Sequence, residues 1–178
     1  MDTIISEKAI ATRVIDMGHV LTEFYRGKSL TVLGVLKGSV VFVADLIRQI
    51  DIPHQIGFIR ASSYRGKTTV PGNLNIATDL MTEITNRHVL LVDDIFDTGR
   101  TMSGLLDELK KHDPASIRTA VLLWKQGRSE VEITPDYHGF QIPDAFVVGY
   151  GLDYNDDYRH LPFIAVLQPS DLGRNTRD

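Results

Sequence analysis

The chain has 178 residues, of which 43% are hydrophobic and 24% charged, with a formal net charge of −4 and no cysteine. This length and composition are typical of one soluble globular domain, spanning residues 1–178, with enough chain to bury a core. The lack of cysteine excludes disulfides, thiolate metal sites and thiol nucleophiles. We find no signal-peptide pattern and no apolar stretch that could span a bilayer, so we expect a cytoplasmic protein without a membrane partner. The acidic balance argues against nucleic acid as a partner.

The first third of the chain alternates between helical and strand patterns. After Ser6, which is placed to cap a helix, apolar residues recur at helical spacing at Ile10, Val14, Met17, Leu21 and Phe24. Residues 30–36 are apolar on both faces, which is typical of a buried parallel strand. We then expect a helix over 40–50 and a second strand over 56–62. Residues 63–73 lack periodicity and predict a long loop, and long loops in compact domains are commonly functional.

The same alternation continues to the C-terminus. We expect a third strand over 89–92, a helix carrying Met102, Leu105, Leu106 and Leu109, and strands over 119–123, 146–148 and 163–167. Strands alternating with helices predict an α/β fold with a mainly parallel central sheet flanked by helices, and the irregular last third predicts a small hood. Ligands of such sheets bind beyond the carboxyl ends of the strands. The turns after residues 36, 59, 92 and 123 are therefore the places to search for a site.

The third strand runs directly into an acidic turn, in the sequence VLLVDDIFDTGRT at 89–101. The adjacent carboxylates of Asp93 and Asp94 repel each other unless Mg²⁺ or hydroxyl groups, such as those of a ribose, compensate them. The first amides of the following helix lack internal partners, and together with the hydroxyls of Thr98 and Thr101 they can bind a phosphate. A purely structural turn with Asp and Thr capping is the alternative, and the density of these residues argues against it.

Other nucleotide and hydrolase motifs are absent or incomplete. A nucleoside-triphosphate hydrolase also places carboxylates at a strand end, but it requires G-x-x-x-x-G-K-[ST]. The Gly-Lys-Ser and Gly-Lys-Thr sequences at 27–29 and 66–68 lack the first glycine of that motif. The six histidines show no paired metal-ligand spacing, and neither G-x-S-x-G nor G-x-G-x-x-G occurs. A histidine metal site, a serine hydrolase and a Rossmann dinucleotide site therefore have no support.

Residues 93–101 resemble the phosphoribosyl-diphosphate motif of type I phosphoribosyltransferases, in which two acidic residues are followed after two apolar positions by D-T-G-x-T. LKGS at 36–39, SSY at 62–64, Lys125 and the run IPDAFVVGYGLDYNDDYRHLPFI at 142–164 are similar, in order, to the hypoxanthine-guanine branch of that family. The resemblance implies transfer of a 5-phosphoribosyl group from phosphoribosyl diphosphate to N9 of hypoxanthine or guanine. It also implies Mg²⁺ as cofactor, release of pyrophosphate, and a homodimer or homotetramer.

The resemblance further implies a role for each matching residue. Asp97 is expected to be the catalytic residue that assists proton transfer at N7 of the purine. The phosphoribosyl and 5′-phosphate site is expected to comprise Asp93, Asp94, Asp97, Thr98, Gly99, Arg100 and Thr101. The pyrophosphate is expected to contact Lys37, Gly38 and Arg159, and the purine to contact Lys125, Phe146, Val147 and Asp153. The expected metal ligands are Asp93, Asp94 and Asp153, and the expected lid residues are Ser63 and Tyr64.

Several alternatives remain open at this point. Lys125 could be a solvated lysine at a strand end, and Phe146 and Val147 could be ordinary core residues. We interpret Asp156 and Asp157 as solvated charges. The acceptor could be xanthine, or the chain could be a phosphoribosyltransferase-fold regulator that binds RNA, although its acidic balance counts against the latter. The family more often has Glu where this chain has Asp93, and the peptide between residues 36 and 37 is often cis in it.

Overall fold

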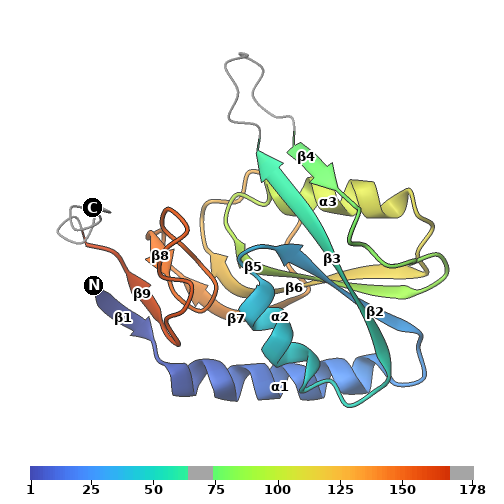
Figure 1. Ribbon diagram of the computed structural model, residues 1–178, viewed down its shortest axis with the longest axis horizontal. Helices are drawn as coiled ribbons and strands as arrows, with labels where there is room; N and C mark the ends of the chain where they lie inside the picture. Colours follow the sequence, from blue (N-terminus) through green and yellow to red (C-terminus); the bar gives the residue numbers. More distant parts are fainter. Residues whose placement is uncertain (64–73, 169–178) are drawn as a thin grey trace.

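The structure, a computed structural model, describes residues 1–63 and 74–168. These residues form a larger sheet with helices on both faces and a smaller, separate sheet (Figure 1). In chain order the elements are β1 (Asp2–Ile5), α1 (Glu7–Tyr25), β2 (Leu30–Leu36), α2 (Val40–Ile47), β3 (His54–Ser63), β4 (Leu74–Ala77), β5 (His88–Phe96), α3 (Arg100–Lys110), β6 (Ser116–Lys125), β7 (Tyr137–Ile142), β8 (Val147–Val148) and β9 (Ile164–Val166).

The larger sheet has the strand order β4-β3-β2-β5-β6-β7. Its neighbouring strands run parallel, apart from β4, which is antiparallel to β3. This arrangement confirms the predicted α/β fold with a mainly parallel central sheet. Because β2, β5 and β6 are adjacent and run in the same direction, their carboxyl ends meet at one edge of the sheet, where folds of this kind bind ligands.

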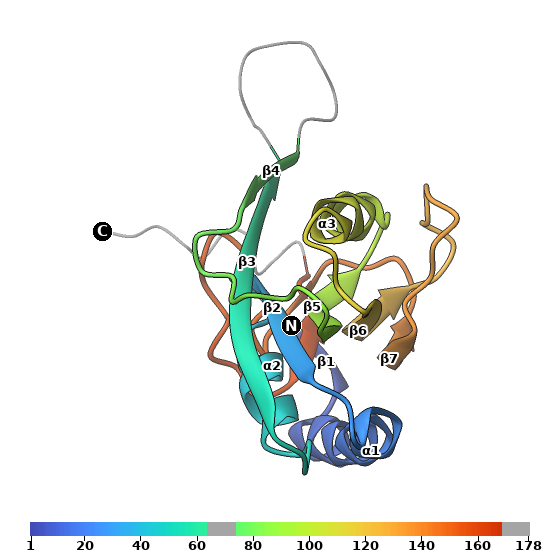
Figure 2. The ribbon, with the colours of Figure 1, turned by 90° about the vertical axis from the view of Figure 1, so that its right-hand side faces the viewer.

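The central strands are mostly apolar because each of their faces supports a separate core. Leu30 and Val32 of β2 pack with α1 and α2, whereas Leu33 and Val35 pack with α3. Figure 2 shows α3 on one side of the sheet and α1 and α2 on the other. Successive side chains of a strand point to opposite faces, so a strand between two helical layers buries side chains on both faces. The one polar side chain of β2, Thr31, accepts a hydrogen bond from Nε of Arg87 at 2.6 Å.

Helix α1 begins and packs as its sequence pattern predicts. The hydroxyl of Ser6 accepts a hydrogen bond from the Ala9 amide at 3.3 Å, which satisfies one of the free amides at the start of the helix. The predicted stripe is buried at Ile10, Val14, Met17 and Leu21, and Phe24 is partly buried beside it. None of the helices formed by the described residues is both long and apolar enough to cross a membrane.

The predicted hood is the smaller sheet, whose strand order is β1-β9-β8. Strand β9 is antiparallel to both of its neighbours, so the hood joins residues from the two ends of the chain (Figure 1). The sequence does not predict β1, because its four residues are mostly exposed and show no alternation. The hood places β8 beside the carboxyl edge of the larger sheet (Figure 1).

Some predicted boundaries are wrong, and each difference has a physical reason. The helix predicted over 40–50 ends at Ile47. Strand β5 runs on to Phe96, because Asp93 and Phe96 still pair with β6 across the sheet. Strands β4 and β7 lie at the two edges of the sheet, where half-exposed side chains leave a weak pattern.

The predicted loop over 63–73 falls mainly outside the described residues. Ser63 belongs to β3 rather than to the loop, since it pairs with Leu74 of β4. Tyr64, the second predicted lid residue, lies outside the described residues.

Candidate active site

A cavity of about 260 Å³ lies at the carboxyl ends of β2 and β5 and at the start of α3. Its lining includes Leu36 at the end of β2 and Gly38 after it, Asp93 to Thr98 at the end of β5 and in the following turn, and Thr101 of α3. The sequence predicts a site in the turns after the first and third buried strands, and the cavity brings those two turns together. Most of the residues expected to bind the phosphoribosyl group line this single cavity.

Asp93 and Asp94 form an acidic pair within β5, in which Asp93 is buried and Asp94 is partly buried. Asp93 is only 8% exposed, and its carboxylate accepts a hydrogen bond from the Asp94 amide at 2.9 Å. Burial, and then the neighbouring charge of Asp94, raise the pKa of Asp93 well above its usual range. Burial also raises the pKa of Asp94. Ionising both carboxylates therefore costs free energy. A cation or hydroxyl donors bound in the cavity would remove that cost.

The turn after β2 approaches this pair through a glycine. A Cβ atom added at Gly38 would lie 1.6 Å from Oδ2 of Asp94, so a larger residue would push the carboxylate aside. The preceding peptide, between Leu36 and Lys37, is cis, as is often the case in the family that the sequence resembles. Gly38 thus allows the expected pyrophosphate turn to lie directly against the acidic pair.

The acidic pair fits the coordination chemistry of Mg²⁺. Among residues 1–63 and 74–168 no group of three or more His, Asp or Glu side chains is arranged to hold a metal ion. Mg²⁺ is commonly held by one or two carboxylates and completed by water and substrate oxygens, which the cavity beside Asp93 and Asp94 can accommodate. Asp153, the third expected metal ligand, is instead bound by Arg159 at 2.8 Å.

The turn between β5 and α3 has the geometry of a phosphate-binding loop. Gly99 has a φ of 81°, and an added Cβ would lie 2.6 Å from Cζ of Phe96, so glycine is required here. Helix α3 begins at Arg100, and the amides of its first turn point toward the loop. The Arg100 side chain forms an ion pair with Glu130, which directs its guanidinium toward the turn after β6. Thr98 and Thr101 line the cavity.

Lys125 and Asp97 form an ion pair on the β6 side of the cavity. The Lys125 ammonium lies 3.3 Å from Oδ2 of Asp97 and 3.6 Å from Oδ1 of Asp144. The Lys125 side chain is only 9% exposed, so its interpretation as a solvated strand-end lysine is wrong. The two residues expected to contact the purine ring atoms are therefore in contact with each other.

Phe146 and Val147 differ sharply in burial. Phe146 is 54% exposed, and its ring lies edge-on to Tyr154 with 5.7 Å between the ring centroids. Val147 is buried in β8, as a core residue would be. The core interpretation is thus wrong for Phe146, whose ring leaves a face available for a planar ligand.

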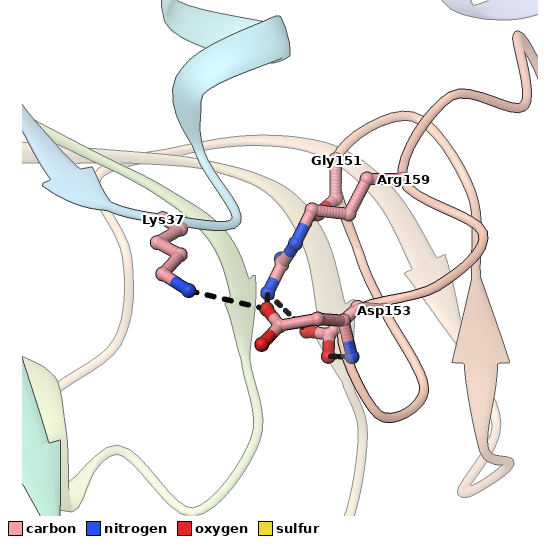
Figure 3. Close-up of polar contacts among 5 residues, drawn as sticks. Lys37, Gly151, Asp153 and Arg159 are labelled. Carbon is pink, nitrogen blue, oxygen red and sulfur yellow. Dashed lines mark hydrogen bonds and ion pairs between the residues drawn. The ribbon is translucent and has the colours of Figure 1, made fainter.

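The two cations expected to bind pyrophosphate are bridged by an aspartate (Figure 3). Oδ1 of Asp156 lies 3.2 Å from the Lys37 ammonium and 2.9 Å from the Arg159 guanidinium. Arg159 also donates to the carbonyl of Gly151 at 2.7 Å. The hydrogen bonds from Arg159 and Lys37 lower the pKa of Asp156. Asp156 is therefore more than the solvated charge that the sequence predicts, although its side chain is 62% exposed.

A tight turn holds Asp156 in this position. Tyr154 and Asp157 exchange two backbone hydrogen bonds, at 3.2 and 3.0 Å, around Asn155 and Asp156. Both central residues have positive φ, 53° and 66°, as the favoured two-residue hairpin turns require. Asn and Asp tolerate this backbone conformation, so the Asn-Asp dipeptide is the signal that could have predicted the turn.

Arg128 and Asp144 belong to the site and have no comparable signal in the sequence. Nε of Arg128 lies 3.0 Å from Oδ1 of Asp97, and its NH1 donates to Asp144 at 2.9 Å. Both residues come from turns, one after β6 and one before β8. Only the folded chain brings them to Asp97 and Lys125.

The family model for the phosphoribosyl transferase domain matches residues 3–155. The chain is 45% identical over 166 residues to a hypoxanthine-guanine phosphoribosyltransferase of Lactococcus lactis, covering 93% of this chain and 90% of that protein. It is 42% identical over 167 residues to a hypoxanthine phosphoribosyltransferase of Haemophilus influenzae, covering 92% of this chain and 93% of that protein. A crystal structure of a hypoxanthine phosphoribosyltransferase from Staphylococcus aureus matches with a TM-score of 0.90 and 40% identity, covering 96% of this chain and 92% of the other.

Proposed function

The chain belongs to the phosphoribosyltransferase family, and we propose that it transfers the 5-phosphoribosyl group of phosphoribosyl diphosphate to N9 of hypoxanthine or guanine. The products are IMP or GMP and pyrophosphate, and the reaction belongs to purine salvage. The observation that carries the proposal is the contact between Asp97 and Lys125 beside the cavity that holds Asp93 and Asp94. This arrangement joins a site for a ribose phosphate to a paired donor and acceptor suited to a 6-oxopurine.

The phosphoribosyl group would be held by the turn between β5 and α3. Asp93 and Asp94 would accept hydrogen bonds from the ribose hydroxyls, which would relieve their buried charge. The amides at the start of α3, with the hydroxyls of Thr98 and Thr101, would bind the 5′-phosphate, as helix N-termini bind anions elsewhere.

The leaving pyrophosphate would lie between the turn after β2 and the loop that carries Arg159. As the bond from C1 of the ribose to the pyrophosphate oxygen breaks, negative charge builds on the leaving group. The ammonium of Lys37 and the guanidinium of Arg159, which lie close together, would stabilise that charge electrostatically. Mg²⁺ bound at Asp93 and Asp94, with a second ion at Asp153, would add Lewis-acid stabilisation of the same charge.

The purine would bind on the β6 side. Lys125 would donate to O6, beside N7, and Phe146 would stack on the ring with its exposed face. The backbone of Val147 and the carboxylate of Asp153 would contact the other edge of the base. As N9 forms its bond to C1, the proton on N7 would move to the carboxylate of Asp97.

Three further features belong to the same proposal. Ser63 and Tyr64 would belong to a lid that keeps water from the cation-like ribose. The assembly would be a homodimer or homotetramer, and the compartment would be the cytoplasm. The absence of cysteine, which suits a reducing compartment, supports the last of these.

One assay tests the proposal directly. Purified protein with Mg²⁺ and phosphoribosyl diphosphate would be given hypoxanthine, guanine, xanthine, adenine or uracil, and nucleotide formation would be followed by chromatography. We expect IMP and GMP, and no nucleotide from adenine or uracil. Product from xanthine in clear excess over the other bases would identify the xanthine-preferring alternative. No nucleotide from any base would refute the proposed function.

A further inference from the structure

Four side chains of alternating charge surround the end of β6. Asp97 contacts Lys125 at 3.3 Å and Arg128 at 3.0 Å, and Asp144 contacts the same two cations at 3.6 and 2.9 Å. Each carboxylate thus lies between two cations, and each cation lies between two carboxylates. We call these four residues, Asp97, Lys125, Arg128 and Asp144, the charge quartet.

The members of the quartet differ in what they can do for a bound base. Lys125 is nearly buried, and an ammonium in that position requires compensating acceptors. Oδ1 of Asp97 is shielded from solvent and lacks a directed hydrogen bond within the described residues, although Arg128 lies 3.0 Å away. The contact between Arg128 and Asp97 is therefore electrostatic, and an acceptor oxygen of Asp97 remains without a donor.

Arg128 is fixed by the turn that carries it. Gly127, with a φ of 76°, reverses the chain after β6. On one side Gln126 donates to the carbonyl of Ile142 at 3.2 Å, and on the other Glu130 donates to the carbonyl of Thr98 at 2.9 Å. The turn is thus hydrogen-bonded both to Thr98, in the turn between β5 and α3, and to Ile142, the last residue of β7. The hydrogen bond from Arg128 also lowers the pKa of Asp144, which keeps that carboxylate charged.

We propose that Arg128, held by Asp144, is a positioning residue that fixes Asp97 so that Lys125 can donate to the purine. If Lys125 were the only cation beside Asp97, a base could take the ammonium's hydrogen bonds only by leaving the carboxylate without a cation. Arg128 supplies the second cation, so Asp97 keeps its place when Lys125 turns to the base. This inference rests on the proposed function, since it assigns Asp97 and Lys125 to the purine.

The inference predicts that loss of Arg128 weakens binding of the base more than binding of phosphoribosyl diphosphate. In Arg128→Ala we expect the KM for hypoxanthine to rise about tenfold, equivalent to about 1.4 kcal/mol, with the KM for phosphoribosyl diphosphate changed less than about twofold. Arg128→Lys, which keeps the charge, should recover part of the loss. Arg118→Gln is the matched control, because Arg118 forms an ion pair with Asp136 near the opposite end of β6 and should leave both KM values near wild type.

A double-mutant cycle tests the role of Asp144. Because Asp144 acts through Arg128, Asp144→Asn combined with Arg128→Ala should raise the KM for hypoxanthine no further than Arg128→Ala alone. Additive effects of the two substitutions would overturn the proposed chain of contacts. An unchanged KM for hypoxanthine in Arg128→Ala, or equal rises for both substrates with a lower Tm, would overturn the positioning role itself.

Calorimetry separates this inference from the proposed function. Binding of GMP and of phosphoribosyl diphosphate can be measured whether or not a preparation turns over. We expect Arg128→Ala to weaken GMP binding about tenfold and to leave phosphoribosyl diphosphate binding within about twofold. Unchanged GMP binding in the variant contradicts the positioning role even where the wild type is active. A wild type that binds GMP but forms no nucleotide contradicts the proposed function alone.

Discussion

The carboxylate of Asp156 lies 3.2 Å from the ammonium of Lys37, and the same oxygen also meets Arg159. An anion of the protein's own chain, Asp156, thus lies between the two cations that we assign to pyrophosphate, both of which are labelled in Figure 3. The bridge joins a turn after β2 to a loop beyond β8, so it also sets the distance between them. Pyrophosphate that enters the site would therefore have to compete with Asp156 for both cations.

Asp156→Asn should therefore tighten pyrophosphate binding. Exposed ion pairs are individually weak, so loss of the two together should lower the Kd of Mg-pyrophosphate by about twofold to thirtyfold. Titration calorimetry at a fixed Mg²⁺ concentration measures the change. Asp107→Asn, which removes an exposed aspartate paired with Lys110 on α3, is the control for net charge. Weaker binding in Asp156→Asn would show that the aspartate organises the cations rather than competing for them.

Asp97→Asn should separate chemistry from substrate binding. An amide cannot take the N7 proton, and general-base catalysis typically contributes about 10²–10⁴-fold, so kcat should fall at least about 100-fold. The KM for phosphoribosyl diphosphate should change little, because Asp93 and Asp94 remain. Steady-state kinetics with both substrates varied gives the two numbers. Turnover close to that of the wild type would exclude Asp97 as the catalytic residue.

The acidic pair predicts a pH-dependent loss of stability in the metal-free protein. Asp93 has a raised pKa in the folded state, so between its unfolded value near 3.8 and the folded value the native chain binds more protons than the unfolded chain. Stability should therefore fall as the pH rises through that window and stay lower above it. Asp93→Asn removes the penalty and should raise Tm at pH 8 by about 2–4 °C for each kcal/mol recovered, with a smaller gain at pH 4.

Calorimetric melting in EDTA, and again with excess Mg²⁺ and phosphoribosyl diphosphate, checks this stability prediction. Bound ligands compensate the pair in the wild type, so the advantage of Asp93→Asn should disappear when they are present. A variant that melts below the wild type at pH 8 in EDTA would contradict the account of a destabilising buried pair.

Phe146→Ala should weaken purine binding without weakening the fold. The ring is half-exposed, so its removal should cost less than about 0.5 kcal/mol of stability. Stacking of a base on an aromatic ring is worth about 1–3 kcal/mol, which predicts a rise in the KM for hypoxanthine of about 5-fold to 150-fold. Kinetics and a thermal melt on the same preparation test both statements. A large fall in Tm would mean that the ring belongs to the core after all.

The sequence predicts the central layers of the fold because their patterns are local and strong. Strand β2 is apolar apart from Thr31, and Ser6 together with the stripe of α1 marks a helix. The residues of the acidic turn are equally predictable, since strand, carboxylates and glycine follow one another directly in the chain. Edge strands such as β7 are not predicted, because they pair with only one neighbour and most of their side chains are only partly buried.

The contacts that complete the site could not be predicted, because they join distant loops. The partners of Lys37 and Asp97 include Asp156 and Arg128, which are exposed charges in turns. In a sequence such residues look like any other solvated charge. Their roles depend on where two loops from different strands meet, and side-chain pairing of this kind leaves no periodic pattern.

Because the hood sheet depends on β9, the site cannot be completed until the last strand has been synthesised. A chain emerges from the ribosome N-terminus first, so β1 is made at the outset and has no partner until Ile164–Val166 have followed. Strand β8 also waits for β9 as its neighbour. The parallel sheet and its acidic turn can assemble from residues already made, whereas β8, next to Phe146, gains its partner only after β9 has been made. We therefore expect the proposed phosphoribosyl site to form before the proposed base site.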